Sequence, residues 1–259
     1  MASAMLAGLF RACPGLACHV IEPNIEARQR LAALGVIVHA AVEPAALHNA
    51  DAVVLAVKPQ SLRDACGQLA PYLRGELIVS IAAGIRIATL SRWLHGHMRV
   101  VRTMPNTPAL IGRGMTGLFA PDEVSAEDVN TALELMRSCG EVIRVESEAM
   151  IDAVTAVSGS GPAYVFHWIE SMQRAASEIG FSDADARTLV LATLKGATAL
   201  ADASAQSPAV LREQVTSKGG TTAAALDVMA DRGVQQALVD AVLAARDRGE
   251  ALGTLLDRE

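Results

Sequence analysis

The sequence predicts an α/β domain built on a parallel sheet, followed by an all-helical domain, and three observations support this. Residues 17–145 alternate short β-rich runs with helical stretches, and the β-rich runs vanish after about residue 150. Turns and small residues follow consecutive β-rich runs. We therefore divide the 259 residues into a first domain over 1–148 and a second over 149–259.

The first domain contains a regular series of elements. The opening MASAMLAGLF predicts a short helix, because its apolar residues share one face. Seven β-rich runs follow, with the sequences ACHVIE, VIVH, AVVLAV, LIVSIA, RVVRTM, MTGLF and EVIRV. Apolar residues at three- and four-residue spacing predict helices over 25–34, 61–73, 87–94 and 126–138. Such alternation is typical of a parallel sheet with helices on both faces.

The second domain is predicted to be helical over 163–179, 183–203, 221–229 and 234–252, with breaks at Gly180, Pro208, Gly219-Gly220 and Gly233. Leu189, Val190 and Leu191 leave little room for a solvated face on the second of these helices. A helix that is apolar nearly all round must be buried, and so small a domain has too little interior. A subunit interface is therefore expected.

Composition excludes several classes of function. The chain has 22 basic and 28 acidic residues and only 3% aromatic residues, so we expect no nucleic-acid partner. The longest apolar runs, such as residues 52–57, are far shorter than the ~20 residues that cross a bilayer, so we expect no membrane partner. Four scattered cysteines without a C-x-x-C pair predict no metal site, no disulfide framework and a cytoplasmic location.

Ligands of doubly wound sheets bind beyond the carboxyl ends of the strands. There the chain has Lys58-Pro59, Ala83-Gly84 and the segment PNTP at 105–108, where small residues and turns let backbone amides approach a flat cofactor. Glu22 ends the first β-rich run, where an acidic residue commonly binds an adenosine ribose. These features favour a Rossmann-like dinucleotide-binding domain. Each one alone is also compatible with ordinary turns or a solvated strand end.

The helical half contains two glycine-bearing motifs. SGSGPAY at 158–164 permits close backbone packing or a tight joint. VTSKGGTTAAAL at 215–226 places a flexible turn before a helix N-terminus, where free amides bind a carboxylate or phosphate. Helix capping by threonine is the structural alternative. No catalytic triad or paired carboxylates are apparent, and hydride transfer from a nicotinamide cofactor fits that absence.

Five motifs resemble those of pyrroline-5-carboxylate reductase in order and spacing, over essentially the whole chain. They are LAVKPQ at 55–60, SIAAG at 80–84, VRTMPNTP at 101–108, SGSGPAY at 158–164 and VTSKGGTT at 215–222. The resemblance implies NADPH- or NADH-dependent reduction of 1-pyrroline-5-carboxylate to L-proline, the last step of proline synthesis. It also implies a homodimer through the helical dimerisation and substrate domain, possibly assembled into a ring of dimers.

The resemblance implies the site residues as well. The substrate carboxylate rests on the amides of residues 217–221, the Thr222 hydroxyl orients the ring nitrogen, and Glu148 contacts the substrate. The implied substrate-binding residues are Glu148, Ser217, Gly219, Gly220, Thr221 and Thr222, with Thr222 also catalytic. The implied cofactor-binding residues are Met1, Ala2, Glu22, Asn24, Ala56, Val57, Lys58, Pro59, Ile81, Ala82, Ala83, Asn106 and Gln214.

Two departures from the family bear on the cofactor. Glu22 stands where many members carry a small hydroxyl residue, and Glu43 lies near a position that is often Asn. A carboxylate repels a 2′-phosphate, which favours tolerance of, or preference for, NADH.

The resemblance also suggests that the N-terminal strand and glycine-rich loop of the family are lacking. MASAMLAGL looks like the helix that follows this loop, so Met1 is expected to be an internal methionine with coding sequence upstream. Two alternatives stay open at this point. One is a non-catalytic truncated dimer, and the other is a reductase like the β-hydroxyacid dehydrogenases, for which Lys195 is the candidate lysine.

Overall fold

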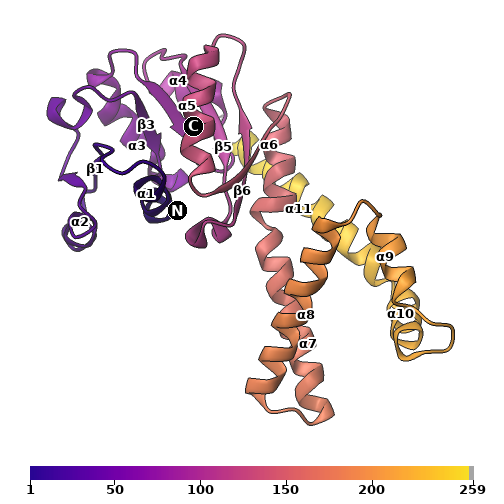
Figure 1. The fold of residues 1–259 in the computed structure, drawn as a ribbon. Helices are drawn as coiled ribbons and strands as arrows, with labels where there is room; N and C mark the ends of the chain where they lie inside the picture. The colour runs from indigo at the N-terminus through magenta and orange to yellow at the C-terminus, as the bar shows by residue number, and fades with distance from the viewer. Residues whose placement is uncertain (257–259) are drawn as a thin grey trace. The chain divides into compact units, whose positions relative to one another are not determined.

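The computed structural model describes residues 1–256, and the chain forms two compact units. The first unit contains Met1–Pro162 and the described residues from Ala244 onward, and the second contains Ala163–Leu243 (Figure 1). The last three residues assigned by the sequence to the second domain, 257–259, lie outside the described range.

The first unit is built on a five-stranded sheet. Its strands, in spatial order, are β3 (Ala52–Leu55), β4 (Leu77–Ser80), β5 (Val100–Met104), β6 (Gly114–Phe119) and β7 (Gly140–Arg144). β3, β4 and β5 are parallel, β6 is antiparallel to β5, and β7 is parallel to β6. The parallel arrangement expected from the sequence therefore holds for the strands that precede the candidate cofactor residues.

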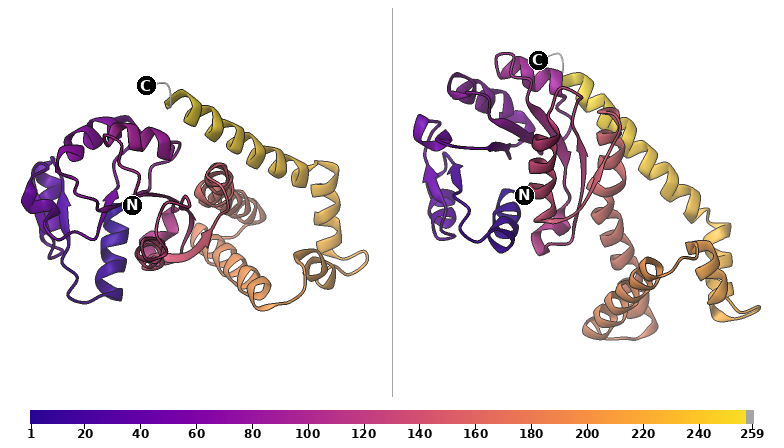
Figure 2. Two further views of the ribbon diagram at one scale, coloured as in Figure 1. Left: turned by 90° about the horizontal axis from the view of Figure 1, so that it is seen from above. Right: turned by 45° about the horizontal axis from the view of Figure 1, so that its top comes forward.

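A second, small sheet pairs β1 (His19–Ile21) with β2 (Ile37–His39) in parallel. These two strands lie beside α2 (Ile25–Ala32) (Figure 2). All seven β-rich runs are confirmed as strands, but they form two sheets rather than one.

Helices cover both faces of the five-stranded sheet, as the sequence predicts. They are α1 (Ala2–Ala12), α3 (Pro59–Leu69), α4 (Ile87–Trp93), α5 (Ala126–Arg137) and α6 (Ala149–Val154). Because strand side chains alternate between faces, Leu77 and Val79 of β4 enter one apolar core while Ile78 enters the other. The first core includes Met5 of α1 and Met136 of α5. The second core is formed with α3 and α4.

Two helices of this unit begin at side-chain caps. The Oδ1 atom of Asn24 accepts the backbone N–H of Ala27 at 2.9 Å, and Ser125 accepts that of Asp128 at 3.1 Å. Such caps satisfy amides that have no partner within the helix. The short 3-10 helices η1 (Pro44–Leu47), η2 (Ala70–Tyr72) and η3 (Thr107–Ile111) connect the larger elements.

A wide π-helical turn, Thr155–Gly159, follows α6 and contains the start of the SGSGPAY motif. The segment packs tightly on the sheet, since a Cβ atom on Gly159 would lie 2.8 Å from Cε of Met104, and one on Gly117 would lie 2.7 Å from Val154. This close approach explains glycine at both positions.

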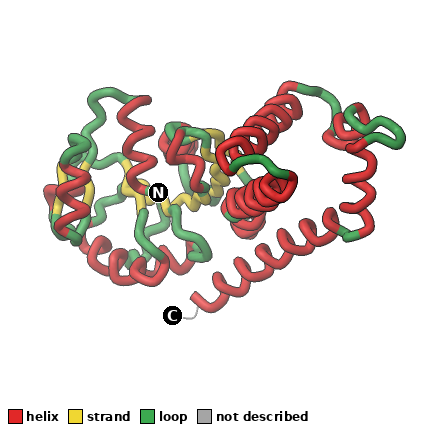
Figure 3. The backbone as a smooth tube through the Cα atoms, turned by 90° about the horizontal axis from the view of Figure 1, so that it is seen from below, coloured by secondary structure: helices red, strands yellow, loops and turns green. Residues whose placement is uncertain are grey.

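The second unit is helical throughout (Figure 3). Its elements are α7 (Gly161–Ile179), α8 (Asp183–Ala203), α9 (Pro208–Gln214), α10 (Thr221–Asp231) and α11 (Val234–Leu256), of which α7 and α11 continue into the first unit. The sequence predicted these helices except α9, where Pro208 was interpreted as a break. Proline at the first helical position is in fact favourable, and Ser207 caps that helix.

Many large apolar side chains of the second unit are exposed. The exposed large apolar residues of its helices include Val165, Phe166, Leu189, Leu200, Val228, Met229, Leu238, Val239 and Leu243. Only Ala186 and Val190 of α8 are buried. Within residues 1–256, no helix is long and apolar enough to span a membrane.

Candidate functional site

The carboxyl ends of three parallel strands bring the candidate cofactor residues to one edge of the sheet. Residues 56–59 follow β3, residues 81–83 follow β4, and Asn106 follows β5. Parallel neighbours end at a common edge, which is where such folds bind ligands. Ala56, Val57 and Lys58 are exposed there, and Pro59 opens α3. The small residues at this edge leave backbone amides accessible to a flat ligand.

Asn106 is fixed by both ends of its side-chain amide. Its Nδ2 donates to the carbonyl oxygen of Ser158 at 3.0 Å, and its Oδ1 accepts the backbone N–H of Met115 at 2.9 Å. The residue is buried. Asn106 therefore tethers the end of β5 to β6 and to the π-helical turn, in addition to any role toward a cofactor.

Glu22 and Asn24 lie together after β1. The Glu22 carboxylate accepts the backbone N–H of Asn24 at 2.8 Å, and the backbone N–H of Glu22 donates to His39 at 2.9 Å. His39 in turn contacts Glu43 through Nδ1 at 2.6 Å and stacks on His19. A negatively charged group in this region would meet two carboxylates, Glu22 and Glu43.

Met1 and Ala2 lie at the start of α1. Met1 caps this helix, and its carbonyl oxygen accepts the backbone N–H groups of Ala4 and Met5. The buried face of α1 contains Met5, Leu6 and Leu9. The helix predicted for the opening residues is confirmed, and packing in the core anchors it.

Glu148 precedes α6 and makes two contacts with the same oxygen. Its Oε1 accepts Nη1–H of Arg102 at 2.9 Å and the backbone N–H of Ile87 at 2.7 Å. The side chain is 27% exposed. Asp152, one turn along α6, lies 3.7 Å from Nη2 of Arg102. The residue that the resemblance assigns to the substrate is thus also part of a buried ionic cluster.

Sequence reasoning missed Arg102 and Asp152. Arg102 is 1% exposed and Asp152 is 5% exposed. Burial raises the pKa of the Asp152 carboxyl, and the positive charges of Arg102 and Arg86 oppose that rise. The available signal was one charged residue inside each of two otherwise uncharged segments, VVRTM at 100–104 and AMIDAV at 149–154. Charged side chains are almost never fully buried unless they are paired.

The candidate substrate residues lie in the second unit. Gly219 has a φ angle of 72°, and Gly220 precedes α10 as its N-cap residue without any side-chain cap. The backbone N–H of Gly220 donates to Ser217 at 3.0 Å and closes the turn. Thr221 and Thr222 then form the first turn of α10. Free amides and the helix dipole at such an N-terminus attract an anion.

Gln214 ends α9, and its Nε2 donates to Oε1 of Gln206 at 2.9 Å. In the described residues this contact ties the end of α9 to the loop before it. Its expected role toward the cofactor stays a prediction.

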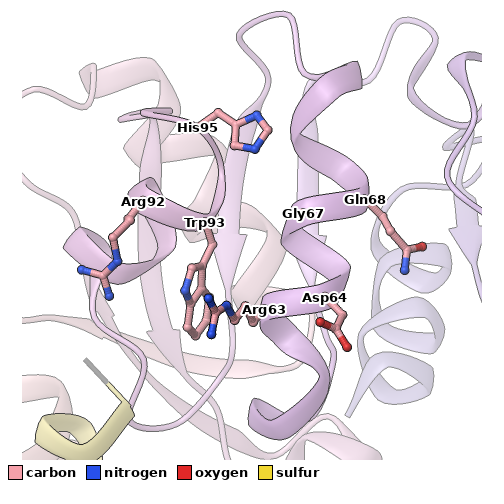
Figure 4. Close-up of a pocket in the computed structure, with 7 residues that line it drawn as sticks. All are labelled: Arg63, Asp64, Gly67, Gln68, Arg92, Trp93 and His95. Atoms are coloured by element: carbon pink, nitrogen blue, oxygen red, sulfur yellow. The ribbon is translucent and has the colours of Figure 1, made fainter. Parts of the chain in front are cut away.

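A surface hollow of the first unit contains none of the predicted site residues. It has a volume of about 510 Å³ and lies between α3 and α4 (Figure 4). Arg63, Asp64, Gly67, Gln68, Arg92, Trp93 and His95 line it. The hollow therefore lies apart from the strand edge described above. Within residues 1–256, no cluster of three or more His, Cys, Asp or Glu side chains is arranged to hold a metal.

A parallel-strand edge with small residues in an α/β unit, followed by a helical unit, is typical of a dinucleotide-dependent oxidoreductase. Residues 1–84 match the family profile described as NADP oxidoreductase, coenzyme F420-dependent, and residues 148–252 match that of pyrroline-5-carboxylate reductase dimerisation. The chain is 42% identical to the pyrroline-5-carboxylate reductase of Pseudomonas aeruginosa over 258 residues, which covers 99% of this chain and 94% of that protein. The chain belongs to the pyrroline-5-carboxylate reductase family.

Solved structures agree with this assignment. The pyrroline-5-carboxylate reductase of Coxiella burnetii superposes with a TM-score of 0.89 at 35% identity, covering 97% of this chain and 94% of that one. The pyrroline carboxylate reductase of Plasmodium falciparum, solved with NADP bound, superposes with a TM-score of 0.85 at 28% identity and the same coverage. The family membership favours this reductase over one like the β-hydroxyacid dehydrogenases.

The expected lack of an N-terminal strand and glycine loop is not supported. The match to the oxidoreductase profile begins at residue 1. Strand β1 at His19–Ile21 is the β-rich run ACHVIE that the sequence already predicts after the opening helix. The expectation rests on the likeness of MASAMLAGL to the helix that follows the glycine-rich loop in the family. In the structure their apolar face is explained by packing of α1 against α5 and η3.

Proposed function

We propose that the chain reduces 1-pyrroline-5-carboxylate to L-proline with a reduced nicotinamide cofactor. The observation that carries this proposal is the turn over residues 217–220 that leads into α10, with Thr222 in the first helical turn. An uncapped helix N-terminus suits the substrate carboxylate. The half-buried Thr222 presents a hydroxyl group in that same first turn, where it orients the ring nitrogen.

The proposed reaction requires few catalytic groups from the protein. The reduced nicotinamide supplies a hydride, which forms the new C–H bond at C5 of the imine. The electron pair of the carbon–nitrogen double bond becomes the lone pair of the ring nitrogen, which keeps the proton that it carried in the protonated imine. The protonated imine is itself an electrophile, so no side chain with a shifted pKa is required as general acid. The role of Thr222 is to hold the nitrogen in place and to relay its proton.

The cofactor is proposed to bind at the strand edge. Residues 56–59, residues 81–83 and Asn106 form its main site, with Met1, Ala2, Glu22, Asn24 and Gln214 as further contacts. Small side chains after β3 and β4 leave room for a flat ligand, which fits a dinucleotide. We keep both NADPH and NADH as cofactors, because Glu22 and Glu43 place negative charge near the adenosine end.

The assembly is proposed to be a homodimer, with rings of dimers as a further possibility. The exposed apolar side chains of α7, α8 and α11 support this, since such surfaces are usually covered by a partner. The description of the profile matched by residues 148–252 points the same way. The cytoplasmic location and the domain boundary at residue 148 stay predictions.

The test is steady-state oxidation of NADPH and NADH with 1-pyrroline-5-carboxylate. Thr222→Val should lower kcat/KM by about 10²-fold, equivalent to about 2–3 kcal/mol for a lost hydrogen bond to a charged group, while Thr222→Ser should retain most activity. Thr188→Val is the matched control, because the Thr188 hydroxyl bonds only within its own helix, to Ala184. Full activity of Thr222→Val would contradict the role of this residue.

Two further results separate the rival functions. A folded wild-type dimer without turnover would favour the non-catalytic alternative. Loss of activity in Lys195→Met, with Thr222→Val unaffected, would favour a lysine-dependent reductase. Lys195 is exposed on α8.

A further inference from the structure

The buried ionic cluster formed by Arg102, Glu148 and Asp152 joins three elements that are distant in sequence. Arg102 lies on β5, and the two carboxylates lie at the start of α6, four positions apart on one helix face. Nη1 of Arg102 donates to Glu148 at 2.9 Å, and Nη2 lies 3.7 Å from Asp152. The cluster therefore fastens α6 to the strand that precedes the candidate cofactor residue Asn106.

The same Glu148 oxygen also holds the start of α4. It accepts the backbone N–H of Ile87, the first residue of α4, at 2.7 Å. The residue before it, Arg86, makes no side-chain cap to this helix. First-turn amides of a helix need an acceptor from elsewhere. A carboxylate at a helix N-terminus also interacts favourably with the helix dipole.

This contact fixes the loop between β4 and α4, residues 81–86. The loop begins with the candidate cofactor residues Ile81, Ala82 and Ala83 and continues through Gly84, which has a φ angle of 74°. One end of the loop is held by pairing of β4 with β5, and the other end by the bond from Ile87 to Glu148. A short segment held at both ends has few conformations available.

The C-terminal part of α11 covers the cluster. A Cβ atom on Gly249 would lie 3.9 Å from Cβ of Asp152, and one on Gly253 would lie 3.3 Å from the carbonyl oxygen of Gly84. The helix thus approaches both α6 and the loop closely through the face that carries Gly249 and Gly253. Arg102 and Asp152 are nearly completely buried, while Glu148 keeps part of its side chain exposed. An interaction between charges is stronger in such surroundings.

We propose that Arg102, Glu148 and Asp152 act as positioning residues that hold the loop over residues 81–86 in the conformation that receives the nicotinamide cofactor. This inference rests on the proposed cofactor role of residues 81–83. Arg102 neutralises the charge of Glu148 and orients its carboxylate. Glu148 then holds the end of the loop by accepting the backbone N–H of Ile87. The cofactor then binds to a loop that is already ordered. Binding therefore carries no entropic cost of ordering the loop, and the affinity is higher.

The test combines two variants with a matched control. Glu148→Ala removes the acceptor for Ile87, and Arg102→Lys keeps the charge but loses the planar geometry that reaches both carboxylates. Arg99→Met is the control, because Arg99 also pairs with a carboxylate, Asp128, at 2.7 Å, and donates to the carbonyl oxygen of Gly75, outside the loop over residues 81–86. Thermal unfolding identifies the variants that remain folded.

The first measurement is binding of NADPH by its change in fluorescence, which needs no turnover. We expect the dissociation constant to rise about tenfold in Glu148→Ala and less in Arg102→Lys, with Arg99→Met unchanged. In turnover assays, Arg102→Lys, which leaves the candidate substrate residue Glu148 in place, should raise the KM for the cofactor while kcat changes less than threefold. Unchanged cofactor binding in folded Glu148→Ala, or an equal loss in Arg99→Met, would overturn the proposal.

The second measurement is amide hydrogen exchange of the peptide that contains Ile87. Exchange should accelerate at least tenfold in Glu148→Ala and not in Arg99→Met. This result does not depend on the reaction that the enzyme catalyses. If exchange accelerates while wild-type protein fails to reduce 1-pyrroline-5-carboxylate, the proposed function is wrong and the positioning role of the cluster stands. If exchange is unchanged, the positioning role itself is wrong.

Discussion

The side chain of Asn106 donates from Nδ2 to the carbonyl oxygen of Ser158 at 3.0 Å, and so joins two family motifs 52 residues apart. Its Oδ1 accepts the backbone N–H of Met115 at 2.9 Å. The two bonds account for asparagine at this position, because the side chain must both donate and accept. The π-helical turn at Thr155–Gly159 presents the carbonyl group that receives the first bond.

Asn106→Ala is expected to lower the free energy of unfolding by about 2–3 kcal/mol, since it removes both bonds of the side chain and leaves the backbone N–H of the half-buried Met115 without its acceptor. Denaturant unfolding of the purified protein measures this change. Asn130→Ala is the control, because Asn130 is exposed on α5. An Asn106→Ala variant as stable as the control would contradict the tether.

Gly8→Ala should destabilise the packing of α1. A Cβ atom on Gly8 would collide with the carbonyl oxygen of Ser138, which is backbone and has little freedom to move. We expect a loss of about 1–3 kcal/mol, the usual effect of overpacking. Gly67→Ala is the matched control in α3, since a Cβ atom there meets nothing within 4 Å. It should stabilise the protein by about 0.5–1 kcal/mol. Melting temperatures that shift in the same direction for both variants would contradict this interpretation.

The pair Arg99–Asp128 makes stability depend on acid pH. Hydrogen bonds from the Arg99 guanidinium lower the pKa of the Asp128 carboxyl below its usual value. The folded state therefore favours the charged carboxylate, and this stabilisation is present above about pH 4, the ordinary carboxyl range. It is lost as the pH falls through the lowered pKa.

Arg99→Ala should accordingly cost about 1–2 kcal/mol at pH 7, a modest value because the Arg99 side chain is 46% exposed. The difference from wild type should shrink toward zero as the pH falls below the ordinary carboxyl range and through the lowered pKa of Asp128. Urea unfolding at a series of pH values provides the measurement. A cost that is independent of pH would show that lost packing, not charge, is responsible.

Glu22→Gln should change the choice of cofactor. Glutamine retains an oxygen that accepts the backbone N–H of Asn24, so the local structure is kept while the charge is removed. The ratio of kcat/KM for NADPH to that for NADH should rise about five- to tenfold, since two unit charges 4 Å apart in water interact by about 1 kcal/mol. Glu26→Gln, on the exposed first turn of α2, is the control. An unchanged ratio would place the 2′-phosphate away from Glu22.

Leu191→Glu tests the proposed dimer. Leu191 is half-buried on α8, beside the exposed Leu189. A carboxylate in an apolar interface is strongly unfavourable, so the variant should elute as a monomer or aggregate in size-exclusion chromatography. Gln206→Glu, in the exposed loop before α9, adds the same charge and should remain dimeric. A dimeric Leu191→Glu protein would place the interface elsewhere.

The sequence predicted the elements well because their signals are local. Alternating and helical periodicities extend over a few residues, and all seven β-rich runs became strands. The helix α9 was missed because Pro208 was interpreted as a break rather than as a first helical residue. The family motifs supplied a candidate site, but their spacing alone does not show what each side chain contacts.

By itself, the sequence determined the α/β and helical halves, the positions of the strands and the membership in the reductase family. Only the tertiary structure decided that β1 and β2 form their own sheet, that β6 is antiparallel, and that Glu148 lies against Arg102 and Ile87. Arg102 and Glu148 are 46 residues apart, and Glu148 and Ile87 are 61 apart. Strand pairing and buried ion pairs are contacts between distant segments, so no local pattern of hydrophobicity or turn residues encodes them.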